Sequence, residues 1–220
     1  MLQILKDIYT DKTIGSLLGF KGGTCLYFFH RLSRFSTDLD FNLVVPKSSS
    51  QRHLTARINK ILKQHVTIQD YTEKRSTYFW LTSYSKGANK IKVEISKRAY
   101  NDEYEFNDLF GIPIILMKKE YMFAHKLCAI SDRSRIVSRD LYDAWFMFEK
   151  RFDIAHHIIK SRTAMETREY FEFLVDYLGQ NFDPNEILQG LGEVLDTRTK
   201  DWAKAKLLTE LNFYLKSYNE

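Results

Sequence analysis

The first half of the chain alternates polar and apolar residues with the two-residue period of a strand. Residues 90–96 show it most cleanly, because Ile91, Val93 and Ile95 fall on one face and Lys92 and Glu94 on the other. Residues 38–45 alternate in the same way. The strands that this pattern predicts are 17–20, 38–45, 66–69, 77–82, 90–96 and 114–117.

Helical spacing of apolar residues dominates elsewhere. It predicts helical or mixed structure over 1–16 and helices over 51–64 and 118–130, with an irregular charged stretch over 97–113. From residue 153 onward, apolar stripes predict a helical bundle. Asp183 and Pro184 are typical of a helix start, so a helix is expected through Leu195 despite Gly190 and Gly192.

The change of pattern near residue 117 divides the chain. We expect an α+β fold in which a small mixed sheet is flanked by helices in residues 1–117, followed by a C-terminal helical bundle in residues 118–220. The second half would complete the active site. No repeat or low-complexity segment stands out.

Composition narrows the class of protein. With 220 residues, 44% of them hydrophobic, the chain can bury a proper core. A net charge of +5 and a pI near 9.0 favour an anionic partner such as a nucleotide or RNA. Cys25 and Cys128 lack metal-ligand spacing and suit a reducing compartment. No apolar run is long enough to span a bilayer, and the N-terminus lacks a signal-peptide pattern, so a cytoplasmic protein is expected.

Two carboxylates provide the clearest chemical signal. Asp38 and Asp40 are two apart, so they share a strand face, which Ser36 joins if the strand begins early enough. Adjacent carboxylates repel one another and are commonly stabilised by a divalent cation or a basic partner. Magnesium suits them because it takes oxygen ligands and keeps positions open for phosphate oxygens.

Just upstream, a glycine pair separates an apolar strand from an apolar helix. The string Lys21-Gly22-Gly23-Thr24 would place free backbone N–H groups at the helix start, where a phosphate could bind. Taken alone, the glycine pair also fits a tight turn without any ligand.

These motifs together carry a resemblance to a known family. The string KGGT followed by RFSTDLDF at Arg34 to Phe41 resembles the AbiEii/MenT nucleotidyltransferase toxins of the polymerase-beta-like superfamily. The resemblance implies that Asp38 and Asp40, with a third carboxylate on a neighbouring strand, hold Mg2+, two ions being expected, and an NTP. Glu94 in IKVEIS matches that third position, although a single acid on a polar strand face is also often only solvated.

A second signature lies in the helical half. The string HKLCAI, then Arg133 and RDLYD, resembles the family's E-K-L-x-A and [RK]-D-x-x-D pattern, with His125 in place of the usual glutamate. The resemblance implies that Lys126 faces the triphosphate. Asp140 and Asp143 share a helix face and could position Lys126, Arg139 or the nucleotide; Asp143 is favoured as the catalytic one, with Arg139 and Asp140 binding the nucleotide. The alternatives are a snorkelling lysine and ordinary first-turn acids.

The acceptor is less constrained. Relatives add nucleotides to the tRNA 3′ end, which blocks translation, and are paired with an AbiEi-like antitoxin in type IV or phage-defence systems. Residues 47–64 contain no acid, and Arg52, Lys60 and Lys63, here called the basic face, could bind RNA or merely be solvated. A protein or small-molecule acceptor, or a non-enzymatic RNA-binding module, are the alternatives, although clustered carboxylates disfavour the last.

Overall fold

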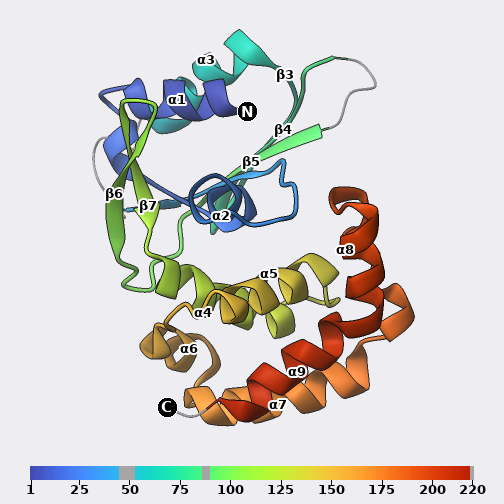
Figure 1. The fold of residues 1–220 in the computed structure, drawn as a ribbon. Helices are drawn as coiled ribbons and strands as arrows, with labels where there is room; N and C mark the ends of the chain where they lie inside the picture. Colours follow the sequence, from blue (N-terminus) through green and yellow to red (C-terminus); the bar gives the residue numbers. More distant parts are fainter. Residues whose placement is uncertain (45–52, 86–89, 219–220) are drawn as a thin grey trace. The chain divides into compact units, whose positions relative to one another are not determined.

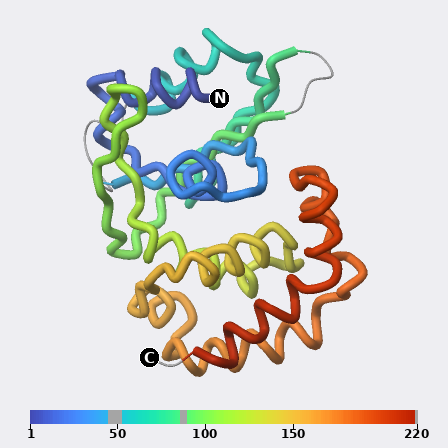
Figure 2. Tube along the Cα trace, in the orientation of Figure 1, coloured from blue at the N-terminus to red at the C-terminus, as the bar shows by residue number. Residues whose placement is uncertain are grey.

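The computed structural model describes residues 1–44, 53–85 and 90–218, and these form two compact units (Figure 1). Unit 1 comprises Met1–Arg31 and Ser36–Lys118, and unit 2 comprises Leu32–Phe35 and Lys119–Glu220. The chain therefore passes between the units at three places, and the brief excursion at Leu32–Phe35 was not predicted. Figure 2 follows the chain through both units.

A seven-stranded mixed sheet forms the centre of unit 1, which confirms the predicted α+β class. The strand order is β3-β4-β5-β2-β1-β7-β6. Strand β2 runs antiparallel to β1 and parallel to β5. The strands are β1 (Leu18–Lys21), β2 (Leu39–Leu43), β3 (Thr67–Lys74), β4 (Thr77–Ser83), β5 (Lys90–Ser96), β6 (Tyr104–Leu109) and β7 (Ile112–Met117).

In the described residues of unit 1, three α-helices accompany this sheet, with a short 3₁₀ turn, η1 (Gly15–Leu17), before β1. The α-helices are α1 (Leu2–Thr10), α2 (Gly22–His30) and α3 (Leu54–His65). The apolar face of β2 packs against α1 and β1, with the Phe41 ring 5.3 Å from that of Phe20 in β1 and 6.4 Å from that of Tyr9 in α1. In α3 the predicted stripe is buried, from Leu54 to Leu62. The expected cap at Ser50 lies outside the described residues.

The prediction for residues 97–113 was wrong in one respect. Residues 104–109 form β6, an edge strand that pairs with β7 through a tight turn. Phe110 and Gly111 both have positive φ in that turn, 54° and 82°. Most of β6 is exposed, so its sequence shows no alternation between buried and exposed residues, and periodicity could not detect it.

Unit 2 is helical, as predicted. Its α-helices are α4 (Lys119–Asp132), α5 (Ser138–Glu149), α6 (His156–Thr163), α7 (Thr167–Asn181), α8 (Thr197–Trp202) and α9 (Leu208–Ser217), the last two joined by a π-helical turn, η5 (Ala203–Leu207). None of the helices in the described part of the chain has the length and apolar character that crossing a bilayer requires.

The helix expected from Asp183 to Leu195 is not formed. Asp183 does cap a helical turn, accepting a hydrogen bond of 2.9 Å from the Asn185 N–H. Only two short 3₁₀ turns follow, η3 (Pro184–Glu186) and η4 (Gly192–Val194). Gly190 adopts φ +67° between them, a conformation outside the right-handed helix.

Candidate functional site

Unit 1 brings three of the predicted site residues into one row across neighbouring strands. Asp40 of β2 is in register with Glu94 of β5 on one side and with Lys21 of β1 on the other. Residues in register on adjacent strands project to the same face of a sheet, within side-chain reach of one another. Glu94 therefore shares the polar face with Asp40, and both side chains are half-buried.

The glycine turn lies directly against this row. Gly22 follows Lys21 at φ +81°, a conformation that side-chain-bearing residues rarely adopt. A Cβ at Gly22 would lie 2.4 Å from Asp40 Oδ2, well inside normal contact. The glycine is thus required both by its conformation and by the close approach of the carboxylate. Gly23, next in α2, is buried.

Thr24 and Ser36 fasten the start of α2 to the segment that carries the aspartates. Both are buried, their hydroxyl oxygens lie 3.0 Å apart, and the Thr24 hydroxyl also donates to the Asp38 carbonyl. These contacts give the two hydroxyls a structural role. Asp38 itself lies just before β2 and is half-buried.

Sequence reasoning missed a polar support beside the carboxylates. Asn42, also on the polar face of β2, donates to Asp102 Oδ2 at 2.9 Å and to the Tyr104 hydroxyl at 3.3 Å. Burial raises the pKa of Tyr104 to about 12, so this phenol stays neutral at physiological pH. The alternation of residues 38–45 already placed Asn42 on this face, which is the signal that could have identified it.

The donor set of the row suits magnesium in one particular way. Among the described residues, no three His, Cys, Asp or Glu side chains are grouped closely enough to hold a metal ion by themselves. Asp40 and Glu94 nevertheless supply two carboxylates on one face. Magnesium is usually bound by one or two carboxylates together with substrate phosphates and water, and these residues fit that mode.

Unit 2 contains a network of five alternating charges. In space, the positive and negative side chains alternate in the order Arg34, Asp143, Lys126, Asp140 and Arg133. Lys126 Nζ lies 2.8 Å from Asp143 Oδ2 and 3.0 Å from Asp140 Oδ1. Arg133 Nε lies 3.0 Å from Asp140 Oδ2. Of the roles that the sequence left open for the two aspartates, contact with Lys126 is the one observed.

The charges in this network stabilise one another. Burial alone would lower the pKa of Lys126, but Asp140 and Asp143 outweigh it and raise that pKa above its ordinary value. Burial would likewise raise the pKa of Asp143, yet Arg34 and Lys126 hold it below its usual range. At neutral pH the lysine is therefore an ammonium and Asp143 a carboxylate.

Arg34 was part of the quoted motif, but the sequence assigned it no role. Its Nε lies 2.6 Å from Asp143 Oδ1 and its Nη2 2.7 Å from Asp143 Oδ2. The pair is 109 positions apart in the chain, and both residues are buried. No local pattern reports a contact at that separation, so only the arginine within RFSTDLDF hinted at it.

The remaining predicted residues are more loosely placed. Arg139 is half-buried in α5, beside Asp140. Lys60 and Lys63 are exposed on α3, whereas Arg52, the third member of the basic face, lies outside the described residues. RNA binding by that face stays a prediction.

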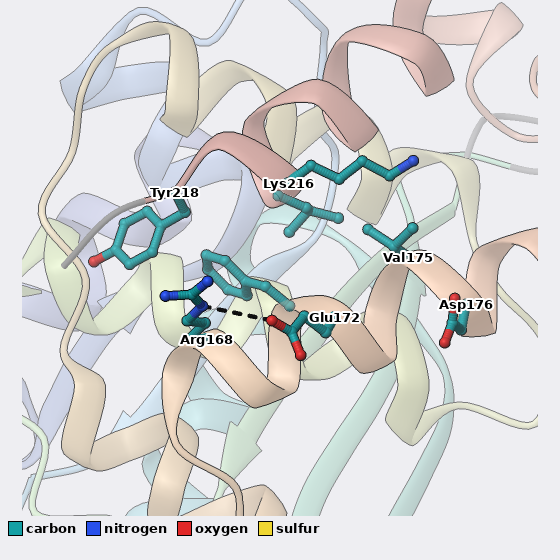
Figure 3. A pocket seen from close by; sticks show the side chains of 8 residues that line it. Arg168, Glu172, Val175, Asp176, Lys216 and Tyr218 are labelled. Carbon is teal, nitrogen blue, oxygen red and sulfur yellow. Dashed lines mark ion pairs between the residues drawn. The ribbon is translucent and has the colours of Figure 1, made fainter.

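A separate pocket of about 250 Å³ lies in unit 2 between α7 and the end of α9 (Figure 3). Its wall includes positively and negatively charged side chains, and Arg168 Nε lies 3.5 Å from Glu172 Oε1. None of the predicted site residues lines it. The lining residues are Arg168, Phe171, Glu172, Val175, Asp176, Leu215, Lys216 and Tyr218.

Solved structures resemble this chain over nearly its whole length. A Helicobacter pylori protein provisionally described as a nucleotidyltransferase is 22% identical, with a TM-score of 0.57 over 99% of this chain and 93% of that one. JHP933 from Helicobacter pylori is 22% identical, with a TM-score of 0.54 over 97% and 89%. At such identities the likeness establishes the fold.

A third structure is MenT4, a nucleotidyltransferase toxin from Mycobacterium tuberculosis, at 18% identity and a TM-score of 0.58, covering 99% of this chain and 82% of that one. No curated protein matches the chain in sequence. The family model described as the nucleotidyl transferase AbiEii toxin of type IV toxin–antitoxin systems matches residues 3–208. With the carboxylate row, the glycine turn and this match over most of its length, the chain belongs to the AbiEii family of nucleotidyltransferase toxins.

Proposed function

We propose that this nucleotidyltransferase toxin uses magnesium to transfer a nucleoside monophosphate from an NTP to the 3′-terminal hydroxyl of tRNA, releasing pyrophosphate and inhibiting translation. The observation that carries the proposal is the register of Asp40 with Glu94 beside the glycine turn. An anionic substrate would not bind two carboxylates without a cation between them.

In this proposal Asp38, Asp40 and Glu94 hold magnesium, with two ions expected. Bound magnesium would polarise the α-phosphoryl group and stabilise charge on the departing pyrophosphate. The residues of the chain supply position: Asp40 is fixed against Gly22, and the Thr24 hydroxyl holds the carbonyl of Asp38. A half-buried site holds its ligands with less competition from water.

The start of α2 is proposed to receive phosphate oxygens. Lys21 is in register with Asp40. It is also the N-cap residue of α2, and its side chain makes no capping hydrogen bond to the N–H groups of the first helical turn, which begins with Gly22 and Gly23. Thr24 and Ser36 would then act on the nucleotide mainly by holding this turn in place.

Lys126 is proposed as the cation that neutralises charge on the triphosphate. Its ammonium is held by two carboxylates, yet its side chain retains 17% exposure. A positioned ammonium stabilises charge that develops during phosphoryl transfer. Asp140 and Asp143 would keep it protonated and oriented, and Arg139 is proposed to contact the nucleotide.

The acceptor is the finer part of the proposal. A pI near 9.0 and the basic face favour RNA over a neutral acceptor. Membership of a type IV family also implies an antitoxin, which we propose to be AbiEi-like. Transfer to a protein or to a small-molecule hydroxyl is the alternative acceptor chemistry.

The test is a labelling experiment. The purified protein is incubated with Mg2+, total tRNA and each of the four α-labelled NTPs in turn. Asp40→Asn is the inactive variant, and Asp70→Asn, on the exposed edge strand β3, is its matched control. Loss of one positioned electrostatic group typically costs about 10²- to 10³-fold in rate, so Asp40→Asn should lose label and Asp70→Asn should keep it.

Each outcome decides a different element of the proposal. Label on tRNA that depends on Asp40 supports both the chemistry and the acceptor, and the favoured NTP identifies the base. Label on protein, or on a small molecule, with the same dependence would refute tRNA as acceptor and leave the carboxylate chemistry in place. Equal labelling by Asp40→Asn and wild type would remove the metal site from the proposal.

A further inference from the structure

Four residues of the nucleotide-binding half of the chain fold with the helical unit. Leu32–Phe35 belongs to unit 2, although the chain on both sides of it belongs to unit 1. Leu32 is buried, and the Ser33 hydroxyl lies 2.7 Å from that of Tyr142. The Phe35 N–H donates to the Val194 carbonyl at 3.1 Å. We call this segment the strap.

Arg34 is the strongest of the strap's anchors. Two parallel hydrogen bonds of 2.6 and 2.7 Å join its guanidinium to both oxygens of Asp143, and its Nη1 donates to the Phe35 carbonyl at 3.1 Å. Such a fork fixes a carboxylate in plane and in rotation, which an ammonium cannot do. The orientation of Asp143 is therefore set from the strap.

That orientation is passed on to Lys126. Asp143 Oδ2 accepts from Arg34 Nη2 and also lies 2.8 Å from Lys126 Nζ. The lysine stem is flexible, so its ammonium settles where the carboxylates hold it. Asp140 is the other such carboxylate, and it is shared with the exposed Arg133. Of the two aspartates that contact Lys126, Asp143 is therefore the one bound by a buried arginine, Arg34.

A purely stabilising role explains this arrangement poorly. A buried ion pair contributes little net stability, because desolvation offsets most of the attraction, and apolar residues of similar volume often serve as well. What a buried fork does provide is fixed geometry. Arg34 also lies two residues before Ser36 and four before Asp38, so it restrains the chain that leads into the carboxylate strand.

We infer that Arg34 is a positioning residue for nucleotidyl transfer, which orients the Lys126 ammonium through Asp143 and anchors the chain that enters the Asp38–Asp40 segment. The inference rests on the proposed function, in which Lys126 and the two aspartates act on the triphosphate. Arg34 itself need not touch the nucleotide.

The experiment compares Arg34→Lys and Arg34→Gln with a matched control, Arg135→Gln. Arg135 is also an arginine of unit 2 with an ion pair, to Glu186 at 2.9 Å, but its side chain is 59% exposed and lies outside the five-charge network. Transfer is measured with saturating NTP over a range of pH, and folded protein is quantified by its unfolding transition.

Arg34→Lys keeps the charge and loses the fork. Misplacement of a catalytic group by about 1 Å can cost about 10²-fold, so kcat should fall by about that factor. The KM for NTP should change less than kcat, because the lost interaction is one realised in the transition state. Arg135→Gln should retain wild-type kcat.

Arg34→Gln provides a readout that loss of fold would not produce. The charged groups facing Asp143 are Arg34 from the strap and Lys126 from α4, with Asp140 one helical turn away on α5. Removing Arg34 leaves the buried carboxylate with Lys126 alone, so its pKa rises and the acid limb of the kcat profile should move to higher pH. Arg34→Lys should leave that limb close to its wild-type position.

The results separate two kinds of failure. An active wild type beside an equally active Arg34→Lys would overturn the positioning role alone. So would a fall in activity that matches the fall in folded protein, with an unmoved acid limb in Arg34→Gln. A wild type that transfers nucleotide to no acceptor would overturn the proposed function, and the positioning role with it.

Discussion

Substitution of Gly22 by alanine tests the contact between the glycine turn and Asp40 directly. Two effects follow from the structure. The backbone at φ +81° costs an L-residue about 1–2 kcal/mol relative to glycine. In addition, the new Cβ would lie 2.4 Å from Asp40 Oδ2, so the carboxylate must retreat by about 1 Å to reach the ordinary contact distance of 3.4 Å.

A second glycine separates these effects. Gly111 has φ +82° in the turn between β6 and β7, and a Cβ there meets nothing within 4 Å. Gly111→Ala should therefore lower the unfolding free energy by the same ~1–2 kcal/mol without affecting transfer. Gly22→Ala should add a loss of about 10²-fold in transfer rate, because a displacement of 1 Å is enough to misalign a catalytic group.

The assay is transfer of label from an α-labelled NTP, with urea unfolding measured on the same preparations. We expect equal backbone strain and unequal transfer activity in the two variants. Gly22→Ala with wild-type turnover would show that the carboxylate tolerates the shift and that its placement is unimportant. Equal loss of activity in Gly111→Ala would show that turnover follows stability alone.

Three further predictions concern the supports of the site. Thr24→Val keeps the shape of the side chain but removes the hydroxyl that donates to the Asp38 carbonyl; urea titration should show a loss of about 1–3 kcal/mol, and an unchanged midpoint would contradict that bond. Asp143 has a lowered pKa in the fold, so its contribution to stability is present above the unfolded pKa of about 4 and disappears as pH falls through the folded value. Unfolding of wild type between pH 7 and pH 3 should show that loss, and Asp143→Asn should flatten it. Neutralising the three residues of the basic face should weaken tRNA binding and reduce its salt slope by about 2 to 3, whereas an unaltered slope would return α3 to an ordinary solvated helix.

The two-residue period explains why Asp40 and Glu94 could each be placed on a polar strand face from the sequence. The alternation of residues 90–96 gave β5 with its observed bounds and placed Glu94 opposite the apolar face. What alternation could not supply was the neighbour of β5. That β2 pairs with β5 in parallel, with Asp40 beside Glu94, depends on the sheet order and not on any local pattern.

The errors share a physical cause. Strand β6 is a mostly exposed edge strand, so its residues do not alternate between a buried and an exposed face. Residues 187–195 have apolar residues at helical spacing but include Gly190 at positive φ. At β6, a strand formed although neither of its faces is buried. From Asp183 to Leu195, apolar spacing was present where the backbone favoured 3₁₀ turns instead. Periodicity reports burial of a face, and it fails wherever burial and backbone geometry do not coincide.

The strap shows the same limit at the site itself. The pairing of β1 with β2, two strands separated by the single helix α2, brings Gly22 and Asp40 together. The Lys126 ammonium instead depends on Asp143, and Asp143 depends on Arg34, a contact across 109 positions. One short segment of the chain therefore contributes Lys21 and Asp40 to the carboxylate row in unit 1 and Arg34 to the five-charge network in unit 2. A substitution at Arg34 should consequently disturb both networks, whereas one at Asp40 should disturb only the first.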